Sequence, residues 1–247
     1  MTDPRTDGVA PAPRSIVVRV LSYNVRSMRD DRAAVARVIR SARPDVVCIQ
    51  EAPRLLRWRS KCAALARTSG LVVVGGGRSA GANLILSTLA VDVLATADVR
   101  FSADPGMHRR GTSIAVLSRG GAPFAVAGTH LDLKPEPRLR HVAELHAAIE
   151  QHVPADVPVI VAGDINDHPG SAVWSALAEH WVDAYTAGPP PVPFTSPARE
   201  PRQTIDGIFV DPRLRINAIE VIEHPDAAAA SDHLPVLVEV EVDVPAA

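Results

Sequence analysis

Short runs of β-branched and aliphatic residues recur along the whole chain, and they constrain its fold more than any other feature. Two of them, VVCIQ at 46–50 and VPVIVA at 157–162, are almost continuously apolar, which is typical of strands that are buried on both faces. Such strands need packed structure above and below them. The chain is therefore predicted to be a layered α/β protein.

About a dozen strands and four helices are expected in all from the spacing of apolar residues. The helices are expected at 31–42, 55–68, 137–152 and 171–180. The other strands are expected at 15–21, 71–74, 84–86, 91–99, 112–117, 124–128, 204–210, 216–222 and 236–242. So many strands do not fit one open sheet that is covered by so few helices. We therefore expect two sheets packed face to face, with the helices outside them.

The chain has 247 residues, of which 47% are hydrophobic, so a single domain over 15–247 with a sizeable core is expected. Residues 1–14 lack periodicity and predict a flexible N-terminal tail without the apolar segment of a secretory signal. No apolar run approaches the roughly 18 residues of a membrane span. Cys48 and Cys62 are too few for a disulfide framework and predict two reduced, buried thiols. We expect a cytoplasmic monomer.

Polar side chains follow the expected strands at the points where the apolar runs stop. They are Asn24, Glu51, His130, Asp164 with Asn166, Asp206, and Asp232 with His233. Ligands gather at the carboxyl ends of strands in α/β sheets, so these residues are candidates for one common site. Singly, each has another interpretation as a turn former, a core histidine or a helix cap. Six coincidental clusters at strand ends are harder to explain than one site.

The chemistry of this set is consistent with metal-assisted hydrolysis of a phosphoester. Carboxylates such as Glu51 and Asp164, and the amide oxygens of Asn24 and Asn166, are hard donors that suit Mg²⁺ or Mn²⁺ rather than zinc. Histidines at the same strand ends supply proton transfer or stabilisation of developing charge. The sequence therefore predicts a divalent-metal-dependent phosphoesterase.

Six motifs, in the order SYN, IQE, GTHLD, GDIN, TIDGIFV and SDHLPV, resemble those of the endonuclease/exonuclease/phosphatase superfamily over residues 15–242. The resemblance implies a four-layer α/β sandwich with Mg²⁺-dependent phosphoesterase activity. It implies metal binding by Asn24 and Glu51, with Asp232 nearby. It also implies contact of Arg110 with the substrate phosphate, because many members carry an arginine at the corresponding place before a central strand.

The same resemblance implies catalytic roles for five residues. Asp164 and Asn166 would position the attacking water and the phosphate. His233 would act in acid–base chemistry or phosphate contact, with Asp206 orienting its ring. His130 would donate a hydrogen bond to a phosphoryl oxygen.

The charge and the aromatic content of the chain bear on its substrate class. The formal net charge of −2 excludes a general electrostatic nucleic-acid binder, and an aromatic content of 4% leaves few platforms for stacking bases. A small or headgroup phosphodiester or phosphomonoester is therefore favoured over nucleic acid, and the Pro-rich segment 187–201 is expected to overhang its pocket. The alternative is a DNA endonuclease or exonuclease of the exonuclease III type. A non-enzymatic binding protein on this fold is disfavoured, because every expected catalytic residue is present.

Overall fold

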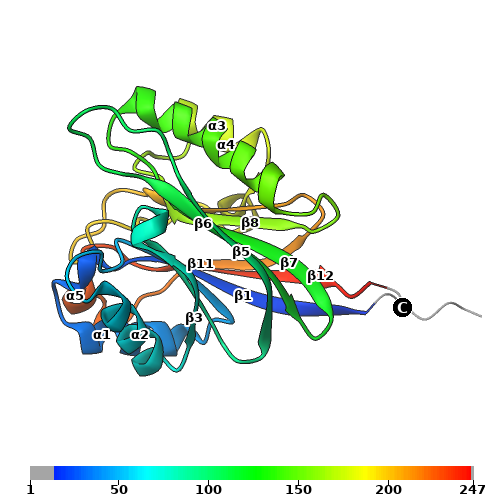
Figure 1. Ribbon diagram of the computed structural model, residues 1–247, viewed down its shortest axis with the longest axis horizontal. Coiled ribbons are helices and arrows are strands. Elements are labelled where there is room, and N and C mark those ends of the chain that lie inside the picture. Colours follow the sequence, from blue (N-terminus) through cyan, green and yellow to red (C-terminus); the bar gives the residue numbers. More distant parts are fainter. Residues whose placement is uncertain (1–13, 246–247) are drawn as a thin grey trace, which may run out of the picture.

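A computed structural model describes residues 14–245 of the chain, and within them the strands form two mixed six-stranded sheets. The sheets pack face to face, and helices cover both outer faces (Figure 1). The predicted α/β sandwich is therefore confirmed. The predicted tail, residues 1–14, lies outside the described residues apart from Arg14.

The first sheet contains both chain ends of the domain. Its strands in spatial order are β11 (Arg215–Val221), β12 (Val236–Asp243), β1 (Ser15–Asn24), β2 (Val46–Gln50), β4 (Asn83–Ser87) and β3 (Val72–Gly77). β1 and β2 are parallel, and the other neighbours are antiparallel. Parallel strands need a crossover, and a helix supplies it between β1 and β2.

The second sheet is built from the middle of the chain. Its strands in spatial order are β5 (Val91–Arg100), β6 (Gly111–Arg119), β7 (Ala122–His130), β8 (Val159–Asp164), β10 (Asp206–Val210) and β9 (Val182–Asp183). β6 and β7 form the predicted hairpin. Its turn residues Gly120 and Gly121 adopt φ of 55° and 86°, the positive values that a type I′ turn requires at both central positions.

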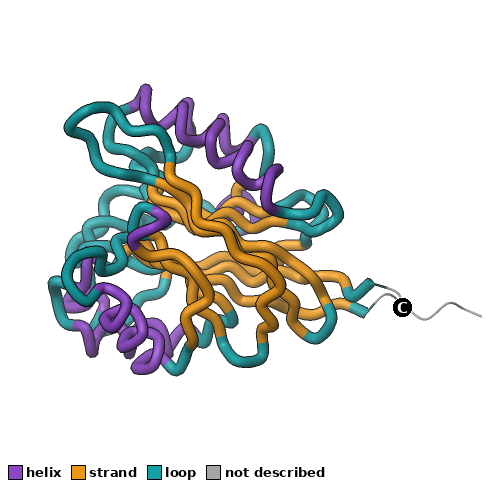
Figure 2. The backbone as a smooth tube through the Cα atoms, in the orientation of Figure 1, coloured by secondary structure: helices purple, strands orange, loops and turns teal. Residues whose placement is uncertain are grey.

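The helices form two outer layers, which Figure 2 shows on either side of the strands. α1 (Arg32–Ala42), α2 (Trp58–Ser69) and the short α5 (Ala227–Ala230) lie on the first sheet, and α3 (Pro135–His152) and α4 (Ala172–Ala178) lie on the second (Figure 1). Asp31 caps α1 by accepting bonds from the backbone N–H groups of Ala33 and Ala34. Three 3₁₀ turns complete the secondary structure: η1 (Arg26–Met28), η2 (Arg78–Ala80) and η3 (Ala184–Ala187).

The strand β2 shows why its sequence is apolar at successive positions. Val46 and Cys48 belong to the core between the two sheets, whereas Val47 and Ile49 pack in the cluster beneath α1 and α2. Successive side chains of a strand point to opposite faces, so a strand with packed layers on both sides buries all of them. All five residues of β2 are buried.

The helix predicted at 55–68 begins later than expected. Arg57 adopts the left-handed conformation with φ of 57°, and α2 starts only at Trp58. Leu55 and Leu56 therefore lie in a loop, with 77% and 83% of their surfaces exposed. The shortest elements, including η2, β9 and α5, were not predicted, because runs of two to four residues carry no periodicity.

Among the described residues no helix is both long enough and apolar enough to span a bilayer.

Both cysteines are free and buried, as predicted. Burial raises the pKa of Cys48 to about 12 and that of Cys62 to about 11. The thiolate is the reactive form, and at neutral pH each thiol stays protonated as well as inaccessible. We expect the native protein to react with iodoacetamide far more slowly than the urea-unfolded protein, at both positions. Rapid labelling of either residue in the native state, measured by mass spectrometry, would contradict this burial.

Candidate active site

The register of the strands brings the predicted polar residues to one edge of the sandwich. In the second sheet, Asp164 at the end of β8 is paired with His130 on β7 and with Asp206 on β10. Gly163 permits this close approach, because a Cβ there would lie 2.2 Å from the carbonyl oxygen of Thr129. β10 is antiparallel to β8, so Asp206 reaches this edge from the amino end of its strand.

Asp164 links the two sheets. Its Oδ2 accepts a hydrogen bond of 2.9 Å from Nδ2 of Asn24, which ends β1 in the first sheet. Its Oδ1 accepts one of 3.0 Å from the backbone N–H of Asn166. Asp164 is 2% exposed, and burial of a carboxylate costs free energy unless its oxygens accept hydrogen bonds such as these.

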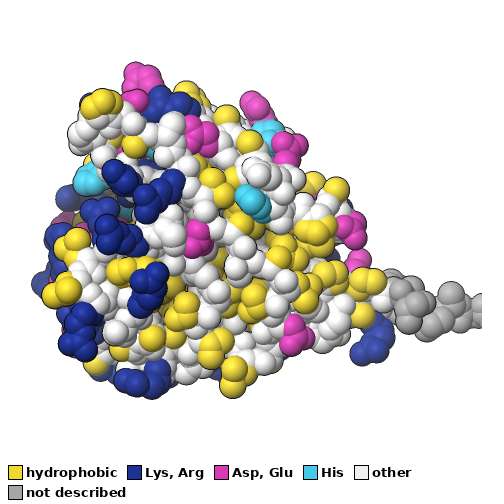
Figure 3. All heavy atoms as spheres, in the orientation of Figure 1, with side chains coloured by type: hydrophobic (Ala, Val, Ile, Leu, Met, Phe, Trp, Pro, Cys, Tyr) yellow, Lys and Arg dark blue, Asp and Glu magenta, His cyan; other side chains and the backbone are white. Residues whose placement is uncertain are grey.

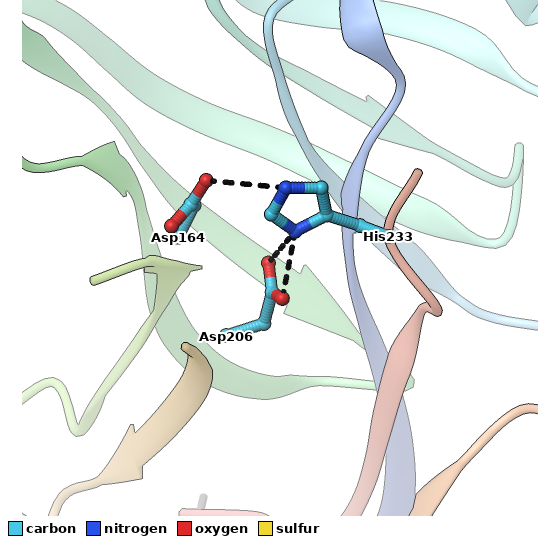
Figure 4. A group of neighbouring side chains, drawn as sticks. All are labelled: Asp164, Asp206 and His233. Carbon is cyan, nitrogen blue, oxygen red and sulfur yellow. Dashed lines mark hydrogen bonds and ion pairs between the residues drawn. The ribbon is translucent and has the colours of Figure 1, made fainter. Parts of the chain in front are cut away.

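His233 and Asp206 form a buried pair (Figure 4). Nδ1 of His233 lies 2.9 Å and 3.1 Å from the two carboxylate oxygens of Asp206, and its Nε2 lies 3.8 Å from Oδ2 of Asp164. Burial by itself lowers the pKa of this imidazole, but the attraction and hydrogen bond of Asp206, with the charges of Asp164 and Asp232, outweigh it and raise the pKa of His233 to about 10. His233 is therefore a cation at neutral pH.

The backbone of Asp206 is held from two further elements. Oη of Tyr185, in η3, donates a hydrogen bond of 2.9 Å to the carbonyl oxygen of Asp206. Oγ1 of Thr195 accepts from the backbone N–H of Asp206 at 3.3 Å. These contacts fix the carboxylate that orients His233.

His130 is neutral. Burial lowers its pKa to about 3, despite the attraction of Asp164. Its Nε2 lies 3.0 Å from Nδ2 of Asn166 and 3.3 Å from Oδ2 of Asp164. Asn166 also donates from Nδ2 to the carbonyl oxygen of Leu131 at 3.0 Å, which fixes the amide orientation. With the amide placed in this way, Nε2 of His130 faces an N–H donor and accepts from it. Donation from His130 to a phosphoryl oxygen would require the other tautomer, with its proton on Nε2.

Glu51 presents a carboxylate with little internal hydrogen bonding. It follows β2 in the left-handed conformation with φ of 52°, and this strained backbone is typical of functional sites. Within residues 14–245 its carboxylate accepts one long hydrogen bond, of 3.5 Å, from Nδ2 of Asn24. The side chain lines the central cavity, where its remaining lone pairs are available to a ligand.

Arg110 brings a buried positive charge to the same cavity. It is 8% exposed, and its Nε has no hydrogen-bond partner among the described residues. Burial lowers the pKa of Arg110, against the opposing attraction of Asp164, Asp132 and Glu51. An arginine nonetheless stays protonated, so this guanidinium is a ready donor for an anion.

These residues surround one cavity of about 310 Å³. Of the predicted site residues it is lined by Glu51, Arg110, His130, Asp164, Asn166 and His233. Asn24 and Asp206 lie directly behind this lining through their bonds to Asp164 and His233. Asp232 does not line the cavity: its carboxylate pairs with Nε of Arg26 at 3.2 Å and is 43% exposed.

The Pro-rich segment 187–201 was expected to overhang the pocket, but none of its residues lines the cavity. It folds back through a bridge between Ser196 and Gln203 and holds the strand-end segment that carries His233. The backbone N–H of Ala198 donates to the carbonyl oxygen of Asp232 at 2.8 Å, and that of Leu234 donates to Thr195 at 2.7 Å.

Two groups of residues offer donors to a cation. Ligand atoms of Asp164, Asp206 and His233 lie within 4.8 Å of one another. However, Nδ1 of His233 is hydrogen-bonded to both carboxylate oxygens of Asp206, so these two groups already engage one another. Glu51, beside the amide of Asn24, is the better fit, because its carboxylate is hardly engaged.

The sequence analysis assigned no role to Ser231 or Arg138. Oγ of Ser231 donates to the backbone oxygen of Asn24 at 2.7 Å, which ties the His233 segment to β1. The guanidinium of Arg138 donates to the backbone oxygen of Asn166 and pairs with Asp167 at 3.0 Å. Ser231 opens the SDHLPV motif, which is a usable signal, whereas nothing near Arg138 in the sequence points to Asn166.

Comparison with known proteins places this geometry in a family. A model of the Endonuclease/Exonuclease/phosphatase family matches residues 21–233. A sequence search of curated proteins gives no significant match.

Three solved structures illustrate the likeness in fold. A family protein from Bacteroides thetaiotaomicron has 18% sequence identity and a TM-score of 0.78, with 92% of this chain and 98% of that chain covered. A mannosyl-6-phosphatase of the same organism has 18% identity and a TM-score of 0.76, with 90% and 99% covered. TDP2 from D. rerio, complexed with a single strand DNA product, has 18% identity and a TM-score of 0.70, with 91% and 98% covered.

The family match spans most of the chain and includes every strand-end residue of the cavity. The chain therefore belongs to the endonuclease/exonuclease/phosphatase family of phosphoesterases and nucleases.

Proposed function

We propose that this protein hydrolyses a small or headgroup phosphoester with the help of a divalent cation, Mg²⁺ or Mn²⁺. One observation carries the proposal: a single cavity has a nearly free carboxylate, Glu51, and two buried cations, Arg110 and His233, on its walls. A metal ion needs negatively charged partners and a phosphate group needs positively charged ones, and this cavity offers both.

Glu51 would hold the cation, and Asn24 would join it through its amide oxygen, although Nδ2 of Asn24 is the amide atom that faces Glu51 in the structure. That oxygen accepts one hydrogen bond, from the backbone N–H of Arg26 at 3.0 Å, and keeps a second lone pair. Asp232 stays a predicted contributor, although its carboxylate is turned toward Arg26. When bound, the cation supplies Lewis-acid polarisation of the phosphoryl group. Members of the family generally depend on such a cation.

Asp164 and Asn166 would orient the attacking water. Oδ2 of Asp164 faces the cavity between Asn24 and the two histidines and is the acceptor for a proton of that water. Asn166 is held rigidly, because Arg138 bonds its backbone oxygen and Leu131 accepts from its side chain. Such fixed donors and acceptors lower the cost of reorganising the site during the reaction.

His233 and Arg110 would stabilise charge on the phosphoryl group. Asp206 engages Nδ1 of His233, so Nε2–H remains for a phosphoryl or leaving-group oxygen. Arg110 offers a buried guanidinium with an unused Nε–H. His130 stays a predicted donor; this role needs a proton on Nε2 and therefore a change in its contact with Nδ2 of Asn166.

The size of the cavity supports a small substrate group. Its volume of about 310 Å³ is at the lower end of the range of roughly 300–1,000 Å³ that is usual for small-molecule pockets. One structural neighbour, the mannosyl-6-phosphatase, is named for a sugar phosphate, and another, TDP2, is complexed with DNA. The alternative substrate is therefore a nucleic acid, cut by an exonuclease III-type endonuclease or exonuclease.

The proposal is tested by comparing hydrolysis of bis(p-nitrophenyl) phosphate and sugar phosphates with incision of abasic duplex DNA at physiological salt. We expect turnover of small phosphoesters that EDTA abolishes and added Mg²⁺ or Mn²⁺ restores. DNA affinity should be weak and fall steeply with salt, because backbone binding releases counterions. Full activity in EDTA would contradict the role of the metal, and efficient incision with tight duplex binding would favour the nuclease alternative.

Glu51→Gln should weaken Mg²⁺ affinity at least about tenfold, because it removes the charge of the proposed ligand while keeping its shape. Isothermal titration calorimetry measures the affinity, and hydrolysis should partly recover at high metal concentration. Glu220→Gln, on the exposed face of β11, is the control for removal of one carboxylate. Unchanged Mg²⁺ affinity in Glu51→Gln would rule out this ligand.

His233→Ala should lower kcat by about 10²–10⁴-fold, the usual contribution of a positioned acid or base. Asp206→Asn should lower kcat by a similar or smaller factor, because it removes the group that orients Nδ1 and holds the imidazole as a cation. Asp104→Asn, on the exposed loop before β6, serves as the matched control. If Asp206→Asn left kcat unchanged while His233→Ala lowered it, Asp206 would not be the group that orients His233 for catalysis.

A further inference from the structure

A second, larger cavity of about 630 Å³ opens beside the catalytic cavity. Its walls come from the loop before α2, from η2, and from the strand ends around β5 and β6, and they carry five arginines. We call it the arginine groove, after Arg54, Arg57, Arg78, Arg100 and Arg109. Lysine and arginine side chains gather on the left of the face shown in Figure 3, toward the end of the sandwich that carries α1 and α2.

The charges of these arginines are not neutralised by the protein. All five are exposed, and within residues 14–245 none of them forms a salt bridge with Asp or Glu. Elsewhere on the surface, arginines such as Arg37 and Arg213 are paired with Asp226 and Asp211. The residues that line the groove include no carboxylate. Like charges gathered in this way destabilise the folded protein unless an anion binds among them.

The groove is continuous with the catalytic cavity. Arg54, Gly81 and Ala82 line both. Gly81 has no side chain and Ala82 has a single methyl group, so Arg54, which is exposed, is the one large side chain among the three shared residues. A molecule whose phosphoester lies against Arg110 can therefore extend into the groove.

The groove also has an apolar wall. Leu55 and Leu56 are largely exposed there, and Trp58 is half-buried with the guanidinium of Arg59 at 4.4 Å from its ring. Exposed leucines beside unpaired arginines suit a ligand with both an uncharged portion and an anionic group.

We propose that the arginine groove is a second anion-binding subsite, and that the substrate carries at least one further phosphate beyond the phosphoester in the catalytic cavity. This inference rests on the proposed function and narrows its substrate class to compounds with several phosphates. Both a multiply phosphorylated small molecule and a short single strand of nucleic acid have this chemistry. From the sequence only Arg110 is a candidate for phosphate contact, because the five groove arginines are scattered over separate segments of the chain.

The subsite is tested by binding, without turnover. Isothermal titration calorimetry with Mg²⁺ present compares linear alkane bisphosphonates of increasing chain length with monophosphonates of the same length. Their carbon–phosphorus bonds are not hydrolysed. When one phosphonate group of a bisphosphonate is bound, the other is held near the second cavity, and this raises the overall affinity of the compound. We expect that, for at least one chain length, the bisphosphonate binds the wild type at least about tenfold more tightly than the monophosphonate of that length.

The double variant Arg57→Gln/Arg78→Gln removes two groove charges from opposite segments, and it should abolish most of this advantage. Arg67→Gln, an arginine near the end of α2 outside the groove, is the control and should keep it. Equal binding of mono- and bisphosphonates at every length would overturn the subsite. An advantage that survives in the double variant would also overturn it, because the second anion would then bind elsewhere or to the metal.

Two further ligands show whether the second phosphate belongs to a small molecule or to a nucleic acid strand. Binding of an inositol polyphosphate and of a short oligothymidylate is compared between the wild type and the double variant. Loss of affinity for either one supports the subsite and identifies its ligand type, whereas unchanged affinity for both overturns it. Hydrolysis of bis(p-nitrophenyl) phosphate by the wild type reports on the proposed catalysis separately, because that compound carries a single phosphate.

Discussion

The buried carboxylate of Asp164 is the interaction on which the rest of the site depends. It accepts hydrogen bonds from Asn24, at the end of β1 in the other sheet, and from the backbone of Asn166, in the loop after β8, and it lies beside both histidines. A buried charge is stable only with such partners, so the two sheets must meet in one register at this edge. The same requirement brings Glu51, at the end of the neighbouring strand β2, into the cavity.

Electrostatics divides the cavity into two functional parts. Asp206 and Asp164 surround His233 and hold it as a cation, while deep burial keeps His130 neutral. Two histidines near one carboxylate thus have different charge states, because their surroundings differ. Glu51 is left with one long hydrogen bond, which suits it to a cation, and the guanidinium of Arg110 and the imidazole of His233 suit the same cavity to phosphate.

Much of this arrangement could be predicted from the sequence, because the strands are marked by apolar runs and their ends by polar residues. β2 was predicted with its observed bounds, and eight strand-end residues were assigned to one site that the structure brings together at one edge, with Asp232 turned outward. Periodicity does not describe loops, however. The late start of α2 depends on the left-handed Arg57, and the fold of 187–201 depends on contacts with residues far along the chain. The arginine groove was missed because net charge does not show where charges gather.

The most direct test of this account is the position of a bound cation. Anomalous diffraction from crystals soaked with Mn²⁺ would locate it among the two candidate groups of donors. The account predicts a manganese peak beside the carboxylate of Glu51, with His233 still hydrogen-bonded to Asp206. A peak between Asp206 and His233, with their hydrogen bond broken, would contradict it, because His233 would then be a metal ligand and not the cation that faces the phosphate.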